Sequence, residues 1–119
     1  MSLQAPYVFS AAMDVEPEKE ALFNEVYDTE HVPLLLKVPG VISVARFKAE
    51  EEVTLVIGGE RRRITVENTP RYHALYELSD PSVLCSPGWT AAVDQGRWPG
   101  QVRPYTRNRH HTLFRRVGK

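Results

Sequence analysis

The chain has 119 residues, of which 25% are charged and 42% belong to the hydrophobic set AVILMFWYC. This composition is typical of a folded globular protein and excludes a disordered segment. The length suits one modest core, so we predict a single domain over residues 1–119. The formal net charge is zero, so no overall positive field attracts nucleic acid or an anionic membrane, and we expect neither as a partner.

Cysteine content and the start of the chain indicate where the protein works. Cys85 is the one cysteine, which excludes an intrachain disulfide and a Cys-x-x-Cys metal or redox pair. The first residues lack the basic start and apolar run of a secretory signal, and no stretch approaches the roughly 20 apolar residues of a membrane span. We therefore expect a cytoplasmic protein.

The first part of the chain predicts a strand, a helix and a second strand. Residues 7–13 are aromatic, β-branched or small, as in a strand buried on both faces. Pro17 suits the first position of a helix that runs to about residue 37. We expect a kink at Pro33, because the residue before a proline avoids the α conformation. Pro39-Gly40 ends the helix, and residues 41–48 form the second strand.

The rest of the chain predicts a hairpin, a strand, two short helices and a last strand. Residues 53–57 and 62–67 flank Gly58-Gly59, which predicts a hairpin inserted over about 49–71. Residues 72–78 form the next strand. Asp80-Pro81 and Ser86-Pro87 each resemble a helix N-cap followed by proline at the first helical position. Residues 105–117 form the last strand after a loop containing proline and glycine.

This order of elements predicts an α+β fold, the ferredoxin-like β-α-β-β-α-β arrangement with an inserted hairpin. Right-handed crossovers place both helical regions on one face of an antiparallel sheet and leave the other face bare. The strands carry apolar residues on both faces, so the bare face needs a cover. We expect a second copy of the chain to provide it, as a homodimer through the sheet face.

Two parts of the sequence resemble the EthD-like members of the dimeric α+β barrel superfamily. They are residues 24–35 (NEVYDTEHVPLL) with 38–47 (VPGVISVARF), and residues 72–78 (YHALYEL) followed by Ser86-Pro87 and Trp89. The resemblance covers roughly 7–48 and 72–117 and leaves out the insertion. It implies two sheets facing each other as a barrel, with a small-molecule cavity in each subunit. Members include isomerases, cyclases, dehydratases, cofactor-free monooxygenases and distant haem enzymes, so the fold alone selects no reaction.

His31 is the first candidate for catalysis, because imidazole both accepts and donates protons near neutral pH. On a continuous helix, Asp28 lies three residues and Tyr27 four residues before His31 on the same side. The Asp28 carboxylate would then orient the His31 ring. The alternative is that His31 and Asp28 cap the helix before Pro33 or pair with an arginine of the last strand.

Three further side chains are candidates for ligand binding. Arg46 is predicted to face a covered side of the sheet, where it needs either a carboxylate such as Glu77 or Asp28 or an anionic or carbonyl ligand. Tyr72 and Tyr76 share one strand face, where their hydroxyls either polarise a carbonyl or lie at the rim of the core. With His31 and Asp28 as the catalytic pair, the candidate ligand-binding residues are Tyr27, Arg46, Tyr72 and Tyr76.

We predict no metal site and no cofactor. His110 and His111 are adjacent, but consecutive strand residues point to opposite faces and cannot chelate one ion. Glycine-rich nucleotide loops, zinc-protease motifs and EF-hand loops are absent from the sequence. These absences argue against nucleotide cofactors and zinc hydrolysis.

Two functions fit these features. The first is a cofactor-independent isomerase, lyase (dehydratase), cyclase or monooxygenase that acts on a small, mostly apolar or aromatic carbonyl compound by His31 acid/base chemistry. Arg46 or a tyrosine would stabilise an enolate oxygen. The second is a non-catalytic binding or accessory protein of a degradation or biosynthesis pathway, which holds such a ligand in the same cavity.

Overall fold

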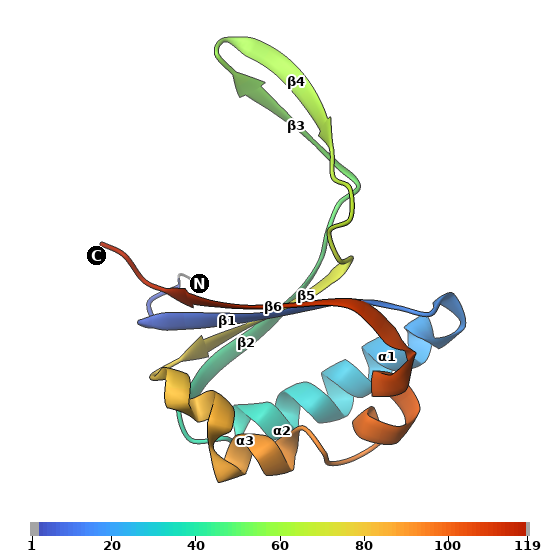
Figure 1. The fold of residues 1–119 in the computed structure, drawn as a ribbon, viewed down its shortest axis with the longest axis vertical. Helices are drawn as coiled ribbons and strands as arrows, with labels where there is room; N and C mark the ends of the chain where they lie inside the picture. Colours follow the sequence, from blue (N-terminus) through green and yellow to red (C-terminus); the bar gives the residue numbers. More distant parts are fainter. Residues whose placement is uncertain (1–2, 119) are drawn as a thin grey trace.

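The computed structural model describes residues 3–118, in which four strands form one antiparallel sheet in the order β2-β5-β1-β6 (Figure 1). The helices all lie on one face of this sheet (Figure 1). The strands are β1 (Tyr7–Val15), β2 (Val41–Lys48), β3 (Glu52–Ile57), β4 (Glu60–Thr65), β5 (Tyr72–Leu78) and β6 (Thr106–Arg115). The order confirms the predicted ferredoxin-like fold with an inserted hairpin.

The first helical region is continuous and contains a π turn where a kink was predicted. It comprises a 3-10 turn (Pro17–Lys19), α1 (Glu20–Val26), the π turn (Tyr27–His31) and α2 (Val32–Leu36). The Val32 amide donates to the Tyr27 carbonyl, five residues back. Pro33 has no N–H, and its ring crowds the preceding turn of a regular helix. The wider turn accommodates this proline without ending the helix.

The second helical region follows the predicted capping pattern. A 3-10 helix (Pro81–Cys85) begins after Asp80, which accepts a hydrogen bond from the Ser82 amide. Helix α3 (Pro87–Ala92) begins after Ser86, which accepts from the Trp89 amide. The predicted loop that follows winds into a second π turn (Trp98–Val102) and a 3-10 turn (Arg103–Tyr105). None of the described helices is long and apolar enough to cross a membrane.

The core lies between the helices and the sheet. Trp98, from the irregular segment before β6, is 3% exposed and packs with Phe23 and Tyr27 of the first helical region. Complete burial of one such large apolar side chain contributes about 1.5–3 kcal/mol. The buried core also includes Met13, Val26, Leu35, Tyr76, Leu78 and Val102.

The face of the sheet opposite the helices is open. Phe47 of β2 and Phe114 of β6 are 55% and 53% exposed. A groove of about 680 Å³ crosses this face and is lined by β1, β5, β6 and residues 67–70. Such a combination of exposed rings and a groove is unusual for the outer surface of an isolated small protein.

Strands β3 and β4 form a separate ribbon, here called the arm. It projects from the sheet on the side away from the helices (Figure 1), and every residue of both strands is exposed. Gly58 and Gly59 have φ values of +60° and +82°, as a two-residue type I′ turn requires. The Ala49 amide donates to the Arg71 carbonyl at 2.6 Å and closes the base. Strand β4 begins two residues earlier than predicted.

Candidate functional site

A pocket of about 420 Å³ lies between the sheet and the helical layer. This volume is within the range of about 300–1,000 Å³ that is usual for small-molecule sites. Three aromatic side chains, Phe9, Trp89 and Trp98, form part of its wall. The polar lining residues are Tyr27, His31, Tyr76, Arg103, Arg109 and His111.

His31 lies at the end of the π turn and faces this pocket. It is 4% exposed, and its ring stacks on Trp98 with ring centroids 4.3 Å apart and 22° between the planes. The Tyr27 ring meets it edge to face at 5.0 Å. Its Nδ1 is fully buried and has no hydrogen-bond partner within residues 3–118. A buried polar atom without a partner costs about 1–3 kcal/mol.

The surroundings keep His31 neutral. Burial, followed by the positive charges of Arg103 and Arg109, lowers the pKa of His31 to about 4. Each of these causes disfavours the imidazolium form. At neutral pH the ring is therefore an available proton acceptor.

Asp28 does not orient His31, contrary to the expectation from sequence. Its carboxylate accepts a hydrogen bond from Arg46 Nη1 at 2.6 Å, and its side chain is 62% exposed. The π turn explains the difference, because residues three apart share a side only on a regular α-helix. The expected catalytic pair is thus separated by the local backbone.

Arg46 takes the ion-pair role that the sequence left open. Besides Asp28, it donates to Asn24 Oδ1 at 2.8 Å, and its guanidinium lies 4.5 Å from the centre of the Tyr27 ring. It lines a narrow crevice beside α1 and not the pocket of His31. These contacts fix the sheet to the helix.

Tyr72 also lies outside the pocket. Its hydroxyl donates to the Glu20 carboxylate and accepts from Asn24 Nδ2 at 3.3 Å. The hydrogen bond from Tyr72, followed by that from Lys48, lowers the pKa of Glu20. Tyr72 therefore binds another part of the protein, although it shares a strand face with Tyr76.

Tyr27 and Tyr76 form a buried hydroxyl pair in the pocket wall, with their oxygens 3.0 Å apart. Burial raises the pKa of both tyrosines, so both remain protonated at neutral pH. Only one of the two protons is used in the bond between them. The other is available to an oxygen of a bound molecule.

Trp98 and Arg103 were not found by sequence reasoning because residues 97–104 read as a loop, and Arg109 was missed within the predicted last strand. The loop is held by Glu30, which accepts from the Arg97 amide at 2.9 Å and from Arg97 Nε at 2.5 Å. Glu25 adds a contact to Arg97 Nη2 at 2.9 Å. Together these bonds fix the segment that places Trp98 over His31.

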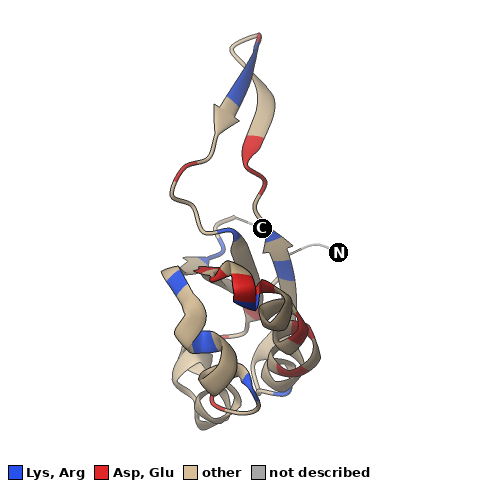
Figure 2. Ribbon diagram, turned by 90° about the vertical axis from the view of Figure 1, so that its right-hand side faces the viewer, with Lys and Arg blue, Asp and Glu red and all other residues tan. Residues whose placement is uncertain are grey.

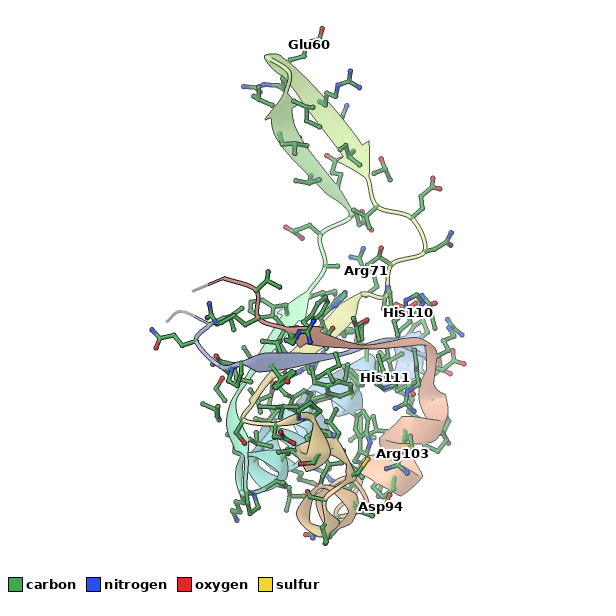
Figure 3. All side chains as sticks on the ribbon, turned by 60° about the vertical axis from the view of Figure 1, so that its left-hand side comes forward. Glu60, Arg71, Asp94, Arg103, His110 and His111 are labelled. Carbon is green, nitrogen blue, oxygen red and sulfur yellow. The ribbon has the colours of Figure 1, made fainter. Side chains whose placement is uncertain are left out.

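His111 was considered only as a partner of His110. The two rings lie on opposite sides of the sheet, as the strand alternation predicts (Figure 3). His110 borders the open-face groove, whereas His111 lines the pocket and stacks on Phe9 at 5.8 Å. Among the described residues, no cluster of three or more histidine, cysteine or acidic side chains has the geometry to hold a metal ion.

Comparison with known proteins identifies the fold. No protein-family model matches the sequence, and no curated protein sequence matches it significantly. Among solved structures, the heme-degrader MhuD from Mycobacterium tuberculosis, with two hemes bound in its active site, has a TM-score of 0.62 and 13% identity over 96% of this chain and 98% of that chain. An ethyl tert-butyl ether degradation (EthD) family protein from Bacillus halodurans has a TM-score of 0.57 and 15% identity, covering 93% and 99%.

HapK from Hahella chejuensis is a further structural neighbour, with a TM-score of 0.57 and 8% identity over 95% of this chain and 94% of that chain. The chain therefore shares the ferredoxin-like α+β fold of these neighbours. The presence of an EthD family protein among the neighbours confirms, at the level of the fold, the EthD-like resemblance expected from the sequence.

Proposed function

We propose that the chain binds a small, largely aromatic carbonyl compound in the His31 pocket and catalyses proton transfer on it without an organic cofactor. The observation that supports this most strongly is the combination, in one cavity, of a neutral imidazole and a pair of protonated hydroxyls. An imidazole base and a hydroxyl donor together are sufficient for enolisation.

The proposed proton transfer uses the His31 imidazole and the Tyr27–Tyr76 hydroxyl pair. His31 takes a proton from the carbon next to the carbonyl, while the free hydroxyl proton of the Tyr27–Tyr76 pair stabilises the enolate oxygen. The imidazolium then returns its proton to another carbon, which gives isomerisation, or to a departing hydroxyl, which gives dehydration. A base with a pKa of about 4 suits an acidified C–H bond, such as one between two carbonyl groups.

The same pocket also supports a non-catalytic binding or accessory role. In that case the aromatic wall and the hydroxyl pair hold a metabolite, and His31 contributes only a hydrogen bond. The two roles differ in turnover, because ligand binding stabilises the folded chain in both.

The test is a panel of lactones, quinones, aromatic acids and diketones, followed by thermal shift and product analysis for wild type, His31→Gln and Tyr76→Phe. His110→Gln is the matched control, because His110 lies on the other side of the sheet. We expect turnover to fall at least a hundredfold in His31→Gln and to be unchanged in His110→Gln. Equal turnover in all variants would contradict the proposal, and binding without turnover would favour the accessory role.

Haem belongs to the panel, because the heme-degrader MhuD is among the structural neighbours. Absorbance titration of wild type and His31→Gln measures it directly. Haem binding that depends on His31 would contradict a reaction without a cofactor.

We further propose that a second copy of the chain covers the open face of the sheet. The exposed rings of Phe47 and Phe114, and the groove that Phe114 lines, support this arrangement. A two-fold axis would bring the same surface of each copy together. The arm projects on this side (Figure 1), and Val53, Leu55 and Ile64 on one of its faces are 38–46% exposed, so they would contact the partner.

A further inference from the structure

The charges in the His31 pocket are all of one kind. Arg103 and Arg109 carry this charge, no aspartate or glutamate among the described residues lines the pocket, and burial lowers the pKa of both of its histidines, His31 and His111. The remaining walls are aromatic or aliphatic. A pocket with this composition has a positive potential and attracts an anionic group from solvent.

Arg103 is anchored in a way that leaves part of its guanidinium available. Its Nη2 donates to the Val93 carbonyl at 2.6 Å and to Asp94 Oδ1 at 2.9 Å. Nη1 and Nε make no hydrogen bond within residues 3–118. Asp94 is 60% exposed and lies beside Arg103 at the edge of the helical layer (Figure 3), so solvent weakens its compensation of the positive charge.

Arg109 faces the pocket because it lies two residues before His111 on β6, on the same face of the strand. Between Ala12 and Asp14 the register with β1 shifts, so that β6 carries one residue more than β1 there. Asn108 takes a left-handed conformation, with φ of +51°, at the same place. The bulge takes Arg107 out of this alternation, so Arg107 lies opposite Asp14 of β1 and outside the pocket.

The guanidinium of Arg109 has no partner among the described residues that would compensate its charge. It makes no ion pair or hydrogen bond within residues 3–118. Arg107, two positions earlier on the same strand, pairs instead with Glu16 at 2.9 Å and lies outside the pocket. The strand thus presents one neutralised arginine and one available arginine.

We propose that Arg103 and Arg109 form an anion-binding pair, and that the ligand of the pocket is an aromatic acid whose carboxylate contacts them while its rings lie among Phe9, Trp89 and Trp98. This assignment rests on the proposed function of the pocket and adds the substrate class. Charge-assisted hydrogen bonds from guanidinium to carboxylate are the strong class of such contacts, and they orient the ligand as well as bind it.

A bound carboxylate would also change His31. The two arginines contribute to the low pKa of His31 in the free protein. A negative charge beside them offsets this contribution and makes the imidazole a stronger base when substrate is present. The anion-binding pair therefore couples binding to the proton-transfer step.

The experiment compares 2-naphthoate with its neutral methyl ester by calorimetry at low salt. We expect the acid to bind at least tenfold more tightly than the ester, with an affinity that falls as salt is added. Arg109→Gln should weaken acid binding about five- to tenfold, and Arg109→Lys should weaken it less. The double variant Arg103→Lys/Arg109→Gln should weaken acid binding more than Arg109→Gln alone. Arg107→Gln, the matched control, should bind the acid as tightly as wild type.

The possible failures are distinct. Equal affinity for acid and ester in wild type, or no loss in the double variant, would overturn the anion-binding pair and leave the pocket function intact. Binding of neither probe at millimolar concentration would overturn both the substrate class and the proposed aromatic pocket. Ester affinity is the folding control, since a variant that still binds the ester retains its pocket.

Discussion

At the scale of single residues, His31 determines what the pocket can do. Its ring is buried and stacked on Trp98, and Nδ1 has no hydrogen-bond partner in the described chain. These conditions are costly for an ordinary core histidine. A proton acceptor that must remain neutral and open to a ligand requires the same conditions.

The low pKa of His31 predicts a pH-dependent stability. Its pKa is about 4 in the folded chain and near 6.5 when unfolded. Between these values the unfolded chain binds more protons, so the free energy of unfolding falls as pH decreases from about 6.5 to 4, by about 3 kcal/mol in total. Denaturant unfolding of wild type and His31→Gln at several pH values measures this contribution.

The stability difference between the two proteins should change by this amount across the window and be constant above pH 7. His111, whose pKa is also lowered by burial, is present in both proteins and cancels. If the difference in the free energy of unfolding between the two proteins were independent of pH, the pKa of His31 would be the same in the folded and unfolded chains.

At the scale of elements, the site depends on two irregular helical turns. The π turn at 27–31 aims Tyr27 and His31 into the pocket, and the π turn at 98–102 brings Trp98 over them. Glu30 and Arg97 join the two turns. The contact is local, so a small change there should alter the pocket without unfolding the sheet.

Gly96 tests this connection. It has φ of +70°, and a Cβ there would lie 2.5 Å from Glu30 Oε1. We expect Gly96→Ala to destabilise the chain by about 1–3 kcal/mol and to weaken ligand binding, as measured by thermal unfolding and calorimetry. Gly100→Ala is the matched control, because a Cβ there meets no atom within 4 Å. Equal effects of the two substitutions would refute the role of the Glu30–Arg97 contact.

At the scale of the whole molecule, the helices cover one face of the sheet and leave the other face open (Figure 1). Figure 2 shows a block of basic residues on the arm, which belongs to Arg61, Arg62 and Arg63 of β4. An isolated two-stranded ribbon is marginally stable in water. The apolar side chains of the arm would gain stability by packing on a second copy.

That residues 1–119 form a single domain stays a prediction.

Removal of the arm separates folding from assembly. The hydrogen bond between Ala49 and Arg71 brings its ends together, so residues 50–70 can be replaced by an Asn-Gly turn. We expect the shortened chain to fold with the same helical circular dichroism and to dimerise more weakly than wild type, by light scattering over a concentration series. Unchanged association would contradict a role of the arm, and a monomeric wild type at high micromolar concentration would contradict the dimer.

Much of the fold could be predicted from local patterns in the sequence. The caps at Asp80 and Ser86 and the turn at Gly58-Gly59 are short-range signals, and the structure confirms each. The order of strands follows from the handedness of the connections. Pro33 indicated an irregular helix but not its kind, because a kink and a π turn both accommodate a proline.

The site was harder to predict, because it depends on shifts of one residue. The π turn moved Asp28 away from His31 and towards Arg46, although a regular helix would have kept them together. The bulge in β6 likewise moved Arg107 off the strand face that it would share with Arg109 and His111. Trp98 lies in a segment without a periodic pattern. The three-dimensional contact between Glu30 and Arg97 holds this segment and explains the burial of Trp98. A periodic sequence pattern predicts which residues share one face of a helix or strand. It fails where the backbone departs from the regular helix or strand.

The central claim is that the cavity around His31 is the ligand site, and the indole N–H signals in a nuclear magnetic resonance titration test it most directly. The chain has two tryptophans, and both Trp89 and Trp98 line this cavity. With 2-naphthoate, we predict that both indole signals shift with one shared dissociation constant, and that the Arg109→Gln variant weakens it. Unchanged indole signals, with shifts confined to residues of the open-face groove such as Ser10 and Thr112, would contradict the account.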